Sequence, residues 1–179
     1  MPQIFRKMLV SERSPARVAR HEIVLSWLGS FVALGCIGLM DQYVARGAGL
    51  PFLIGSFGAS AVLVFGACGS PFAQPRNLVG GHVISAITGV FCSSLLPDMT
   101  WLAASLAVAT SIALMHMTVT LHPPGAATAL VAVTGGESIH QLGYFFAIVP
   151  CLAGALVMLL VALLANNLPK SRRYPAFWW

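Results

Sequence analysis

The stretch LHPPGAATALVAVTG, residues 121–135, decides the fold prediction, because it sets a histidine and two prolines directly before a run of small apolar residues. Proline has no amide donor and disfavours helical angles at the residue before it, so a helix that arrives at His122 should end there. A new helix can begin at Pro123 or Pro124, because proline is tolerated in a first turn. We therefore expect a broken helix with an accessible N-terminus, whose free amides suit an anion or a polar solute.

The composition places this break within a membrane. The chain has 179 residues, of which 58% are hydrophobic and 8% are charged, whereas soluble domains carry roughly 25% charged residues. The cations lie mainly in an N-terminal arm, residues 1–21, and in a basic, aromatic tail, residues 169–179. This distribution is typical of segments that flank a membrane rather than of a nucleic-acid surface. The sequence therefore predicts an integral, multi-pass membrane protein that contacts the lipid bilayer and no nucleic acid.

A transmembrane domain is predicted over residues 22–168. Crossing a bilayer takes about 20 apolar residues, and the stretches that approach this length are 23–40, 78–96, 99–121 and 143–165. Two shorter apolar segments, 50–68 and 121–135, lie between them. We expect an all-α fold of about six helical segments in two three-helix repeats, 22–96 and 99–168, with short or broken helices in each.

A weak internal similarity favours this repeat. Laying Gly58 on Gly125 also lays Leu63 on Leu130, and the order of a long, an interrupted and a long helix recurs in both halves. The first half offers a matching break at GSFGAS, residues 55–60. Two helix starts could then converge near the middle of the membrane, where broken helices are tolerated only against protein or a water-filled cavity. A pathway for a small solute is therefore the functional interpretation.

The topology follows from the basic ends. The positive-inside rule puts both termini in the cytoplasm, so the number of crossings should be even. Six crossings would place Arg76 on the side of the termini and relate the halves by inversion, whereas four would leave Arg46 and Arg76 outside. We favour six, in a bacterial inner membrane. The N-terminal arm lacks the apolar region of a cleaved signal peptide, so we expect it to be retained.

Two motifs carry a resemblance to a known family. The stretch GSFGASAVLVFGACGSPFAQPRNLVGGH, residues 55–82, followed by HPPGAATAL, residues 122–130, resembles the HPP family of integral membrane proteins, named for its His-Pro-Pro signature. The resemblance covers residues 27–165. Members from plastids and cyanobacteria are associated with nitrite transport, so the resemblance implies passage of a small anion such as nitrite. The two motifs fall on Ser60, Gln74, Pro75, Arg76, Asn77, His122, Pro123, Pro124 and Gly125.

The predicted solute pathway consists of the polar and small residues around the two breaks. They are Gly58, Ser60, Gln74, Arg76, Asn77, His82, His122, Pro123, Pro124, Gly125 and Thr128. His122 either caps the preceding helix or contacts the solute, and His82 either packs against a neighbouring helix or lines the path. Arg76 either sets the topology at the headgroups or attracts an anion at the mouth. Gln74 and Asn77 could donate hydrogen bonds to the same ligand.

Other functions lack their motifs. Intramembrane catalysis needs a nucleophile with a base, paired carboxylates or a metal set, and no GxSxG or HExxH motif is present, so we expect neither an enzyme nor a cofactor. The four cysteines have no Cys-x-x-Cys spacing and indicate packing rather than a metal site or disulfides. No buried carboxylate stands out as a proton carrier, which favours a channel-like facilitator over a tightly coupled pump. A structural or sensory membrane protein, whose broken helices serve assembly, is the alternative.

Small residues predict close helix packing. Gly81, Ser85, Gly89 and Ser93 recur every four residues, a spacing that lets two helix backbones approach. A chain this small has further small-residue faces, so self-association into a homo-oligomer is also expected.

Overall fold

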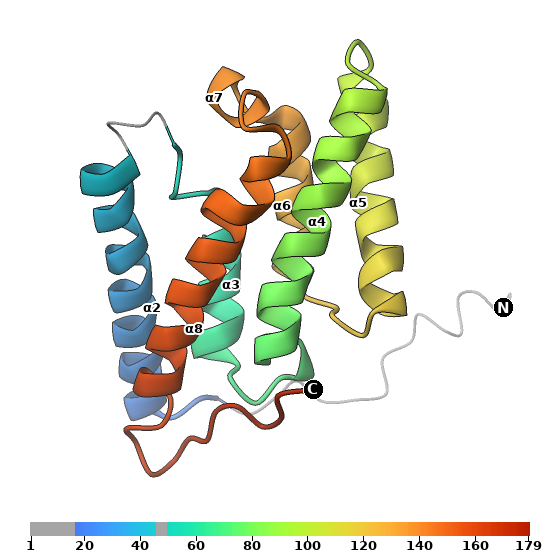
Figure 1. Ribbon diagram of the computed structural model, residues 1–179. Helices are drawn as coiled ribbons and strands as arrows, with labels where there is room; N and C mark the ends of the chain where they lie inside the picture. The colour runs from blue at the N-terminus through green and yellow to red at the C-terminus, as the bar shows by residue number, and fades with distance from the viewer. Residues whose placement is uncertain (1–16, 46–49) are drawn as a thin grey trace, which may run out of the picture.

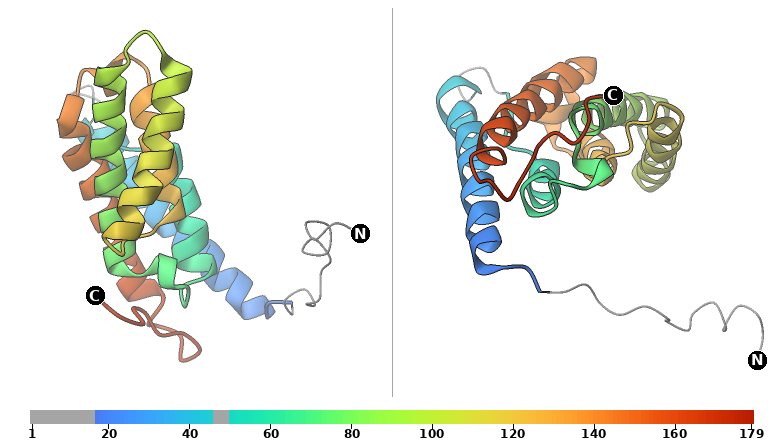
Figure 2. Two further views of the ribbon diagram at one scale, coloured as in Figure 1. Left: turned by 90° about the vertical axis from the view of Figure 1, so that its right-hand side faces the viewer. Right: turned by 90° about the horizontal axis from the view of Figure 1, so that it is seen from below.

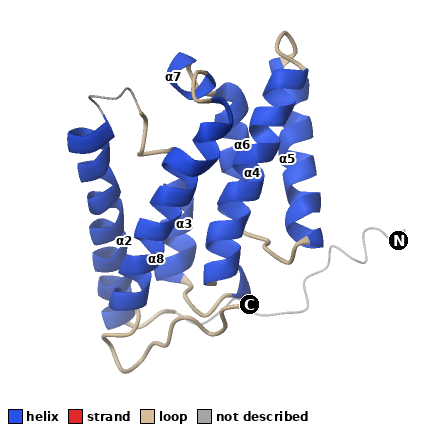
Figure 3. Cartoon of the chain, viewed as in Figure 1, coloured by secondary structure: helices blue, strands red, loops and turns tan. Residues whose placement is uncertain are grey.

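The computed structural model describes residues 17–45 and 50–179, and these ranges contain helices and no strand (Figure 3). Four helical stretches in them are long and apolar enough to cross a bilayer: Arg20–Val44, Pro75–Leu95, Thr100–Met117 and Gly143–Ala165. Two shorter apolar helices, Gly55–Gly66 and Pro123–Thr134, have 12 residues each. The prediction of an all-α, polytopic membrane protein is therefore confirmed.

The helices follow one another as α2 (Arg20–Met40), α3 (Gly55–Gly66), α4 (Pro75–Leu95), α5 (Thr100–Met117), α6 (Pro123–Thr134), α7 (Glu137–His140) and α8 (Ala153–Ala165). Single turns accompany them: Asp41–Ala45 continues α2, Pro71–Ala73 precedes α4, and Gly143–Ala147 with Ile148–Leu152 leads into α8. Residues 1–16 of the predicted N-terminal arm, and Arg46, lie outside the described ranges.

The chain runs along the long axis of the bundle in alternating directions (Figure 1). It rises through α2, descends through residues 50–54 into α3, rises through α4 and descends through α5. It then rises through α6 and descends through α8 to the end at which α2 begins. α2 lies at one edge of the bundle and α5 at the other, as the view from below in Figure 2 also shows. Between these edges, α3 and α6 therefore run in opposite directions.

Both short helices begin part-way along the bundle, each after an extended residue. Ile54 (φ −96°, ψ 146°) precedes α3. His122 (φ −136°, ψ 102°) precedes α6, which has proline in its first turn. The predicted break at His122 is confirmed, and it comes after a longer interruption than expected, because α5 already ends at Met117. The predicted span 99–121 was therefore too long.

Asp41 stabilises the extended segment that leads into α3. Its Oδ1 accepts the backbone N–H groups of Phe52 (2.7 Å) and Leu53 (3.1 Å). Amides outside a helix find no water inside a bilayer, so a side-chain acceptor must replace it. Asp41 therefore has a structural role at the place where the chain turns back into the bundle.

The last predicted span, 143–165, is kinked rather than straight. Val149 has extended backbone angles (φ −127°, ψ 117°), and α8 begins only at Ala153. Pro150 supplies no amide for the preceding turn, which accounts for the interruption.

Glycines bring α4 and α6 into backbone contact. A Cβ atom built on Gly89 would lie 2.6 Å from the carbonyl oxygen of Ala129 and 2.7 Å from the Cβ of Ala132. A Cβ on Gly125 would lie 2.8 Å from the carbonyl oxygen of Gly81. These separations are shorter than van der Waals contact, so only glycine permits the observed approach of the two helices.

We expect Gly89→Ala to lower the free energy of unfolding by about 1–3 kcal/mol, because backbone atoms of α6 must move to admit the methyl group. Gly35→Ala is the matched control: Gly35 also lies within a helix, α2, and a Cβ there meets nothing within 4 Å. The measurement is denaturant titration in detergent, followed by circular dichroism. Equal midpoints for the two variants would contradict the contact between α4 and α6.

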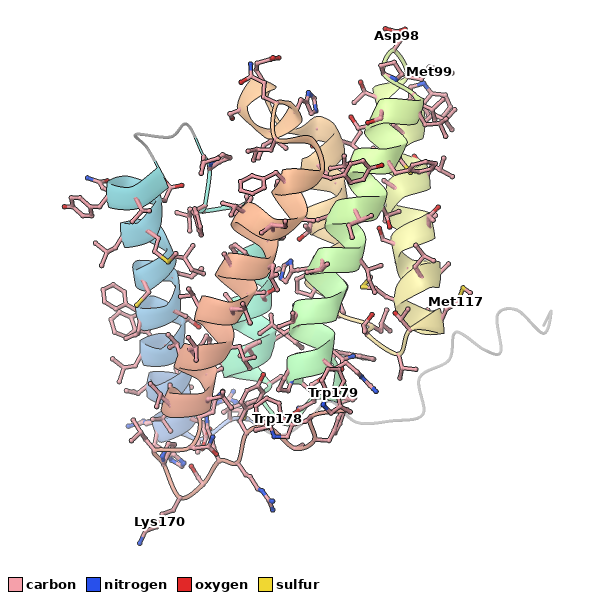
Figure 4. All side chains as sticks on the ribbon, viewed as in Figure 1. Asp98, Met99, Met117, Lys170, Trp178 and Trp179 are labelled. Atoms are coloured by element: carbon pink, nitrogen blue, oxygen red, sulfur yellow. The ribbon has the colours of Figure 1, made fainter. Side chains whose placement is uncertain are left out.

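The predicted C-terminal tail, residues 169–179, folds back under the bundle (Figure 4). The side chain of Tyr174 is 2% exposed, and its hydroxyl donates to the carbonyl oxygen of Ala73 at 2.8 Å. Burial raises the pKa of the Tyr174 phenol above its usual value. Trp178 and Trp179 lie beside the first turn of α4. The tail is therefore packed onto the domain rather than held apart from it.

Candidate functional site

Five polar side chains meet in the interior between α3, α4 and α6. Ser56 and Ser60 come from the first two turns of α3, His82 from α4, and His122 and Thr128 from the start of α6. None of them is more than 1% exposed. We call these five residues the polar cluster.

Ser60 stands at the centre of the polar cluster. Its Oγ lies 2.8 Å from Nε2 of His82 and 2.8 Å from Nε2 of His122. The two imidazole rings are 5.1 Å apart between centroids and inclined by 59°. The other nitrogen of His122, Nδ1, donates to the carbonyl oxygen of Phe72 at 2.8 Å. The ring of His122 therefore bonds to the interior and to the turn before α4, and not to the end of α5.

The cluster continues on the other side of His82. Its Nδ1 lies 2.6 Å from Oγ1 of Thr128, and that oxygen lies 2.9 Å from Oγ of Ser56. Because Ser56 and Ser60 are four residues apart on α3, they share one face of that helix. A continuous series of hydrogen bonds thus connects Phe72, through both histidines, to the first turn of α3.

Neighbouring residues of α4 hold His122 in place. Asn77 donates from Nδ2 to the carbonyl oxygen of Leu121 at 2.8 Å, which fixes the residue before the histidine. A Cβ on Gly81 would lie 2.5 Å from the Cβ of His122. The backbone of α4 therefore leaves room for the histidine only because residue 81 is glycine.

The family of the chain is settled by sequence comparison. A family model described as the HPP transmembrane region matches residues 15–175, most of the chain. The chain belongs to the HPP transmembrane family.

Relatives of this HPP protein include two transmembrane proteins of Dictyostelium discoideum. One is 45% identical over 180 residues, which cover 99% of this chain and 58% of the relative. The other is 43% identical over 182 residues, which cover 99% of this chain and 64% of the relative. The chain thus spans about three fifths of the length of these curated relatives. No solved structure matches it.

Most of the predicted pathway residues of the HPP protein lie in or beside the polar cluster. Ser60, His82, His122 and Thr128 belong to it, and Asn77 supports it. The first turn of α6 contains Pro123, Pro124 and Gly125.

Gln74 and Gly58 lie elsewhere. The amide nitrogen of Gln74 donates to the carbonyl oxygens of Cys68 (3.0 Å) and Ser70 (2.7 Å), and its Oε1 accepts from the backbone of Ala176 (2.8 Å). Gln74 therefore joins the turn before α4 to the C-terminal tail. Gly58 is exposed, and a Cβ there would meet nothing within 4 Å.

Arg76 lies in the first turn of α4, near the C-terminal tail. It lines a cleft of about 380 Å³ together with Phe72, Asn77, His116 and Phe177. Its Nε is buried and has no hydrogen-bond partner among the described residues. The carbonyl of Phe72 links this cleft to His122. Arg76 is therefore close to one end of the hydrogen-bond series without belonging to the polar cluster.

Two members of the hydrogen-bond series were not predicted. Ser56 is one turn before Ser60, and this spacing was the available signal. The carbonyl of Phe72 could not be predicted from the sequence, because every residue has a backbone carbonyl and only the tertiary structure decides which of them accepts from His122.

The polar cluster contains hydroxyl and imidazole groups and no carboxylate. Both groups can donate and accept, so they can bind a polar solute or pass a proton. Within residues 17–45 and 50–179, no group of three or more His, Cys, Asp or Glu residues could hold a metal ion. The four cysteines are free thiols, and Cys92 and Cys151 are buried.

Proposed function

We propose that this HPP protein passes a small solute across the membrane, and that the solute is a small anion such as nitrite. The observation that carries the proposal is the polar cluster itself. Five hydrogen-bonding side chains, each at most 1% exposed, lie where two short helices begin part-way through an otherwise apolar bundle. Polar groups at such depth are costly in a bilayer, and in transporters they mark the solute path.

The paths of the two halves support the proposal. α2, α3 and α4 run up, down and up, whereas α5, α6 and α8 run down, up and down. This is the pattern of an inverted repeat with six crossings, in which the binding site lies at the interface of the repeats. The polar cluster has this position, because α3 belongs to the first half and α6 to the second.

The charge near the cleft supports an anion as the solute. Arg76 lines the cleft that adjoins Phe72, and the positive charge of its guanidinium there would raise the local concentration of anions. The N-terminal turns of α3 and α6 add positive dipole ends at the cluster.

The orientation is part of the same proposal. Arg76 shares one end of the bundle with the C-terminal tail and the start of α2, and this basic end would face the cytoplasm by the positive-inside rule. The relatives named above come from Dictyostelium, so the bacterial inner membrane expected from the sequence stays a prediction.

Nitrite uptake into liposomes tests the function. We expect uptake above that of empty vesicles for the wild-type protein, and a fall to the empty-vesicle level for His122→Ala, which removes the link between α6 and Ser60. The empty vesicles are essential because nitrous acid crosses lipid unaided. His21→Ala is the matched control, since that side chain is 64% exposed at the start of α2.

The decisive comparison is made with protein shown to be folded by circular dichroism. Wild-type uptake equal to that of empty vesicles would exclude nitrite and favour the structural or sensory alternative. Equal uptake by wild type and His122→Ala would place the path elsewhere.

A further inference from the structure

The two imidazoles of the polar cluster offer a second activity. The sequence indicates no buried carboxylate as a proton carrier, but two imidazoles joined by one hydroxyl can transfer protons as well. Ser60 lies within 2.8 Å of Nε2 of both His82 and His122. The question is whether the donors and acceptors follow one another in a single direction.

The direction of these hydrogen bonds is set by the carbonyl oxygen of Phe72, which can accept a hydrogen bond but cannot donate one. His122 donates to it from Nδ1, so the Nε2 of a neutral His122 is bare and accepts from the Ser60 hydroxyl. Ser60 has then donated its only proton and must accept from the Nε2–H of His82. These three bonds fix opposite tautomers for the two histidines, with the proton on Nδ1 of His122 and on Nε2 of His82.

The order begins at His82. Its bare Nδ1 lies 2.6 Å from Oγ1 of Thr128. The Thr128 hydroxyl also donates to Oγ of Ser56 at 2.9 Å, so its single proton is shared between these two acceptors. The donors of His82, Ser60 and His122 thus follow one another toward Phe72.

We propose that the polar cluster is a proton relay, and that the protein moves its solute together with a proton. The coupling of the proton to a solute rests on the proposed function. One proton binds the bare Nδ1 of His82, His82 and Ser60 each pass their own proton to the next group, and one proton leaves Nδ1 of His122. Each transfer forms one O–H or N–H bond as it breaks another, so no electron is gained or lost, and the positive charge resides transiently on an imidazolium.

Burial connects the relay to a conformational change. After one passage every donor is reversed, and the rings must turn to restore the first order. Both rings are 0% exposed and enclosed by α3 and α6, so they turn only when these helices separate. A solute that separates α3 from α6 therefore allows one proton to follow.

No other ionisable side chain of the described residues is bonded to the relay. α3, α6 and α8 carry no ionisable side chain, since His122 precedes α6. The other elements bring Arg20, His21, Glu22 and Cys36 on α2, Asp41 and Tyr43 in the turn after α2, Arg76 and Cys92 on α4, His116 on α5, Glu137 and His140 on α7, and Tyr144 and Cys151 in the turns before α8. Within the described part of the chain, none of these side chains is hydrogen-bonded to His82 or His122.

The relay ends beside a cleft of about 380 Å³, which is lined by Phe72, Asn77 and His116. His122 is 0% exposed and its Nδ1 is covered by the Phe72 carbonyl, so it releases its proton to water in the cleft only when this carbonyl moves away. At the other end His82 is 0% exposed, so the relay is closed there until α3 moves.

The first test measures the histidine side chains by ¹⁵N NMR in lipid, with a pH titration. At neutral pH we expect the proton on Nδ1 of His122 and on Nε2 of His82. On acidification the pair should take up one proton as a unit, and the two Nε2 signals should move together, because Ser60 passes the proton between them. In Ser60→Ala each ring should titrate by itself. Separate titrations in the wild type, or the same tautomer in both rings, would overturn the relay.

The second test measures coupling in liposomes, using nitrite as the probe and subtracting uptake by empty vesicles. Uptake of one anion with one proton carries no net charge. An inward proton gradient should therefore raise wild-type uptake, whereas a potassium diffusion potential set with valinomycin should leave it unchanged. Ser60→Ala should lose the response to the proton gradient. Ser111→Ala should behave as wild type, because Ser111 is also 0% exposed but its Oγ has no hydrogen-bond partner in the part of the chain that the structure describes.

The outcomes separate the two proposals. Wild-type uptake that follows an inside-positive potential and ignores the proton gradient would overturn the coupling and leave the anion pathway standing. No protein-dependent uptake of nitrite would count against the proposed function, and the NMR titration would then decide the relay by itself.

Discussion

Replacing Arg172 with alanine is expected to lower the free energy of unfolding by about 2 kcal/mol, within the range for hydrogen bonds that involve a charged group. The guanidinium is 6% exposed and donates from Nε to Oε2 of Glu22 at 2.6 Å. It also donates to the carbonyl oxygen of Phe65 (3.0 Å), to Oδ1 of Asn166 (2.9 Å) and to Oγ of Ser26 (2.9 Å). One side chain thus joins the tail to α2, to the end of α3 and to the residue that follows α8.

The loss is large because alanine removes the donor to several acceptors at once, including Oε2 of Glu22, whereas Oε1 of this carboxylate keeps its hydrogen bond from Ser171. The measurement is denaturant titration in detergent, with tryptic cleavage of the tail as a second readout. Arg173→Ala is the matched control, because Arg173 is the next residue and is exposed. Equal midpoints for the two variants would show that the contacts of Arg172 contribute nothing to the stability of the fold.

The second large effect is expected from Gly81→Ala, which should reduce nitrite uptake roughly tenfold or more, since a displacement of about 1 Å can cost that much where geometry decides function. The added methyl carbon would lie 2.5 Å from the Cβ of His122 and 3.1 Å from the carbonyl oxygen of Thr120. His122 must therefore move away from α4, and its 2.8 Å hydrogen bond to Ser60 cannot persist.

Gly35→Ala is again the control, because a Cβ on that residue of α2 meets no atom within 4 Å. Nitrite uptake is divided by the amount of folded protein in the liposomes, which separates an effect on the pathway from a lower yield of folded protein. A Gly81→Ala variant with unchanged uptake and an unchanged His122 NMR signal would contradict the position of this histidine.

The breaks in the bundle were predictable from the sequence because their cause is local. Proline lacks an amide donor in any context, so Pro123 and Pro124 were enough to predict the interruption before α6 from the sequence. The length of the interruption did not follow, since α5 ends at Met117 and the chain turns through Val119, whose φ of 55° is rare for a β-branched residue. For Gln74 the sequence suggested a wrong role. Its place in the motif suggested a contact with the solute, yet its amide is hydrogen-bonded to the loop before α4 and to the tail.

The basic tail was predicted as a segment flanking the membrane. Composition could not distinguish Arg172 from Arg173, although one is buried against Glu22 and the other is exposed. Burial of a cation depends on whether acceptors from distant parts of the chain surround it, and that arrangement is a property of the folded structure.

By itself, the sequence determined that this HPP protein is an all-α, polytopic membrane protein and that two of its helices are short and interrupted. Both properties are local or compositional: lipid demands apolar residues along each span, and proline demands a break where it stands. Only the tertiary structure decided which polar groups meet. Ser60 bonds to His122 across 62 residues, and Thr128 to Ser56 across 72, because α3 and α6 start at the same depth from opposite halves. Such contacts depend on how helices pack, and glycines at the contact of α4 with α6 set that packing.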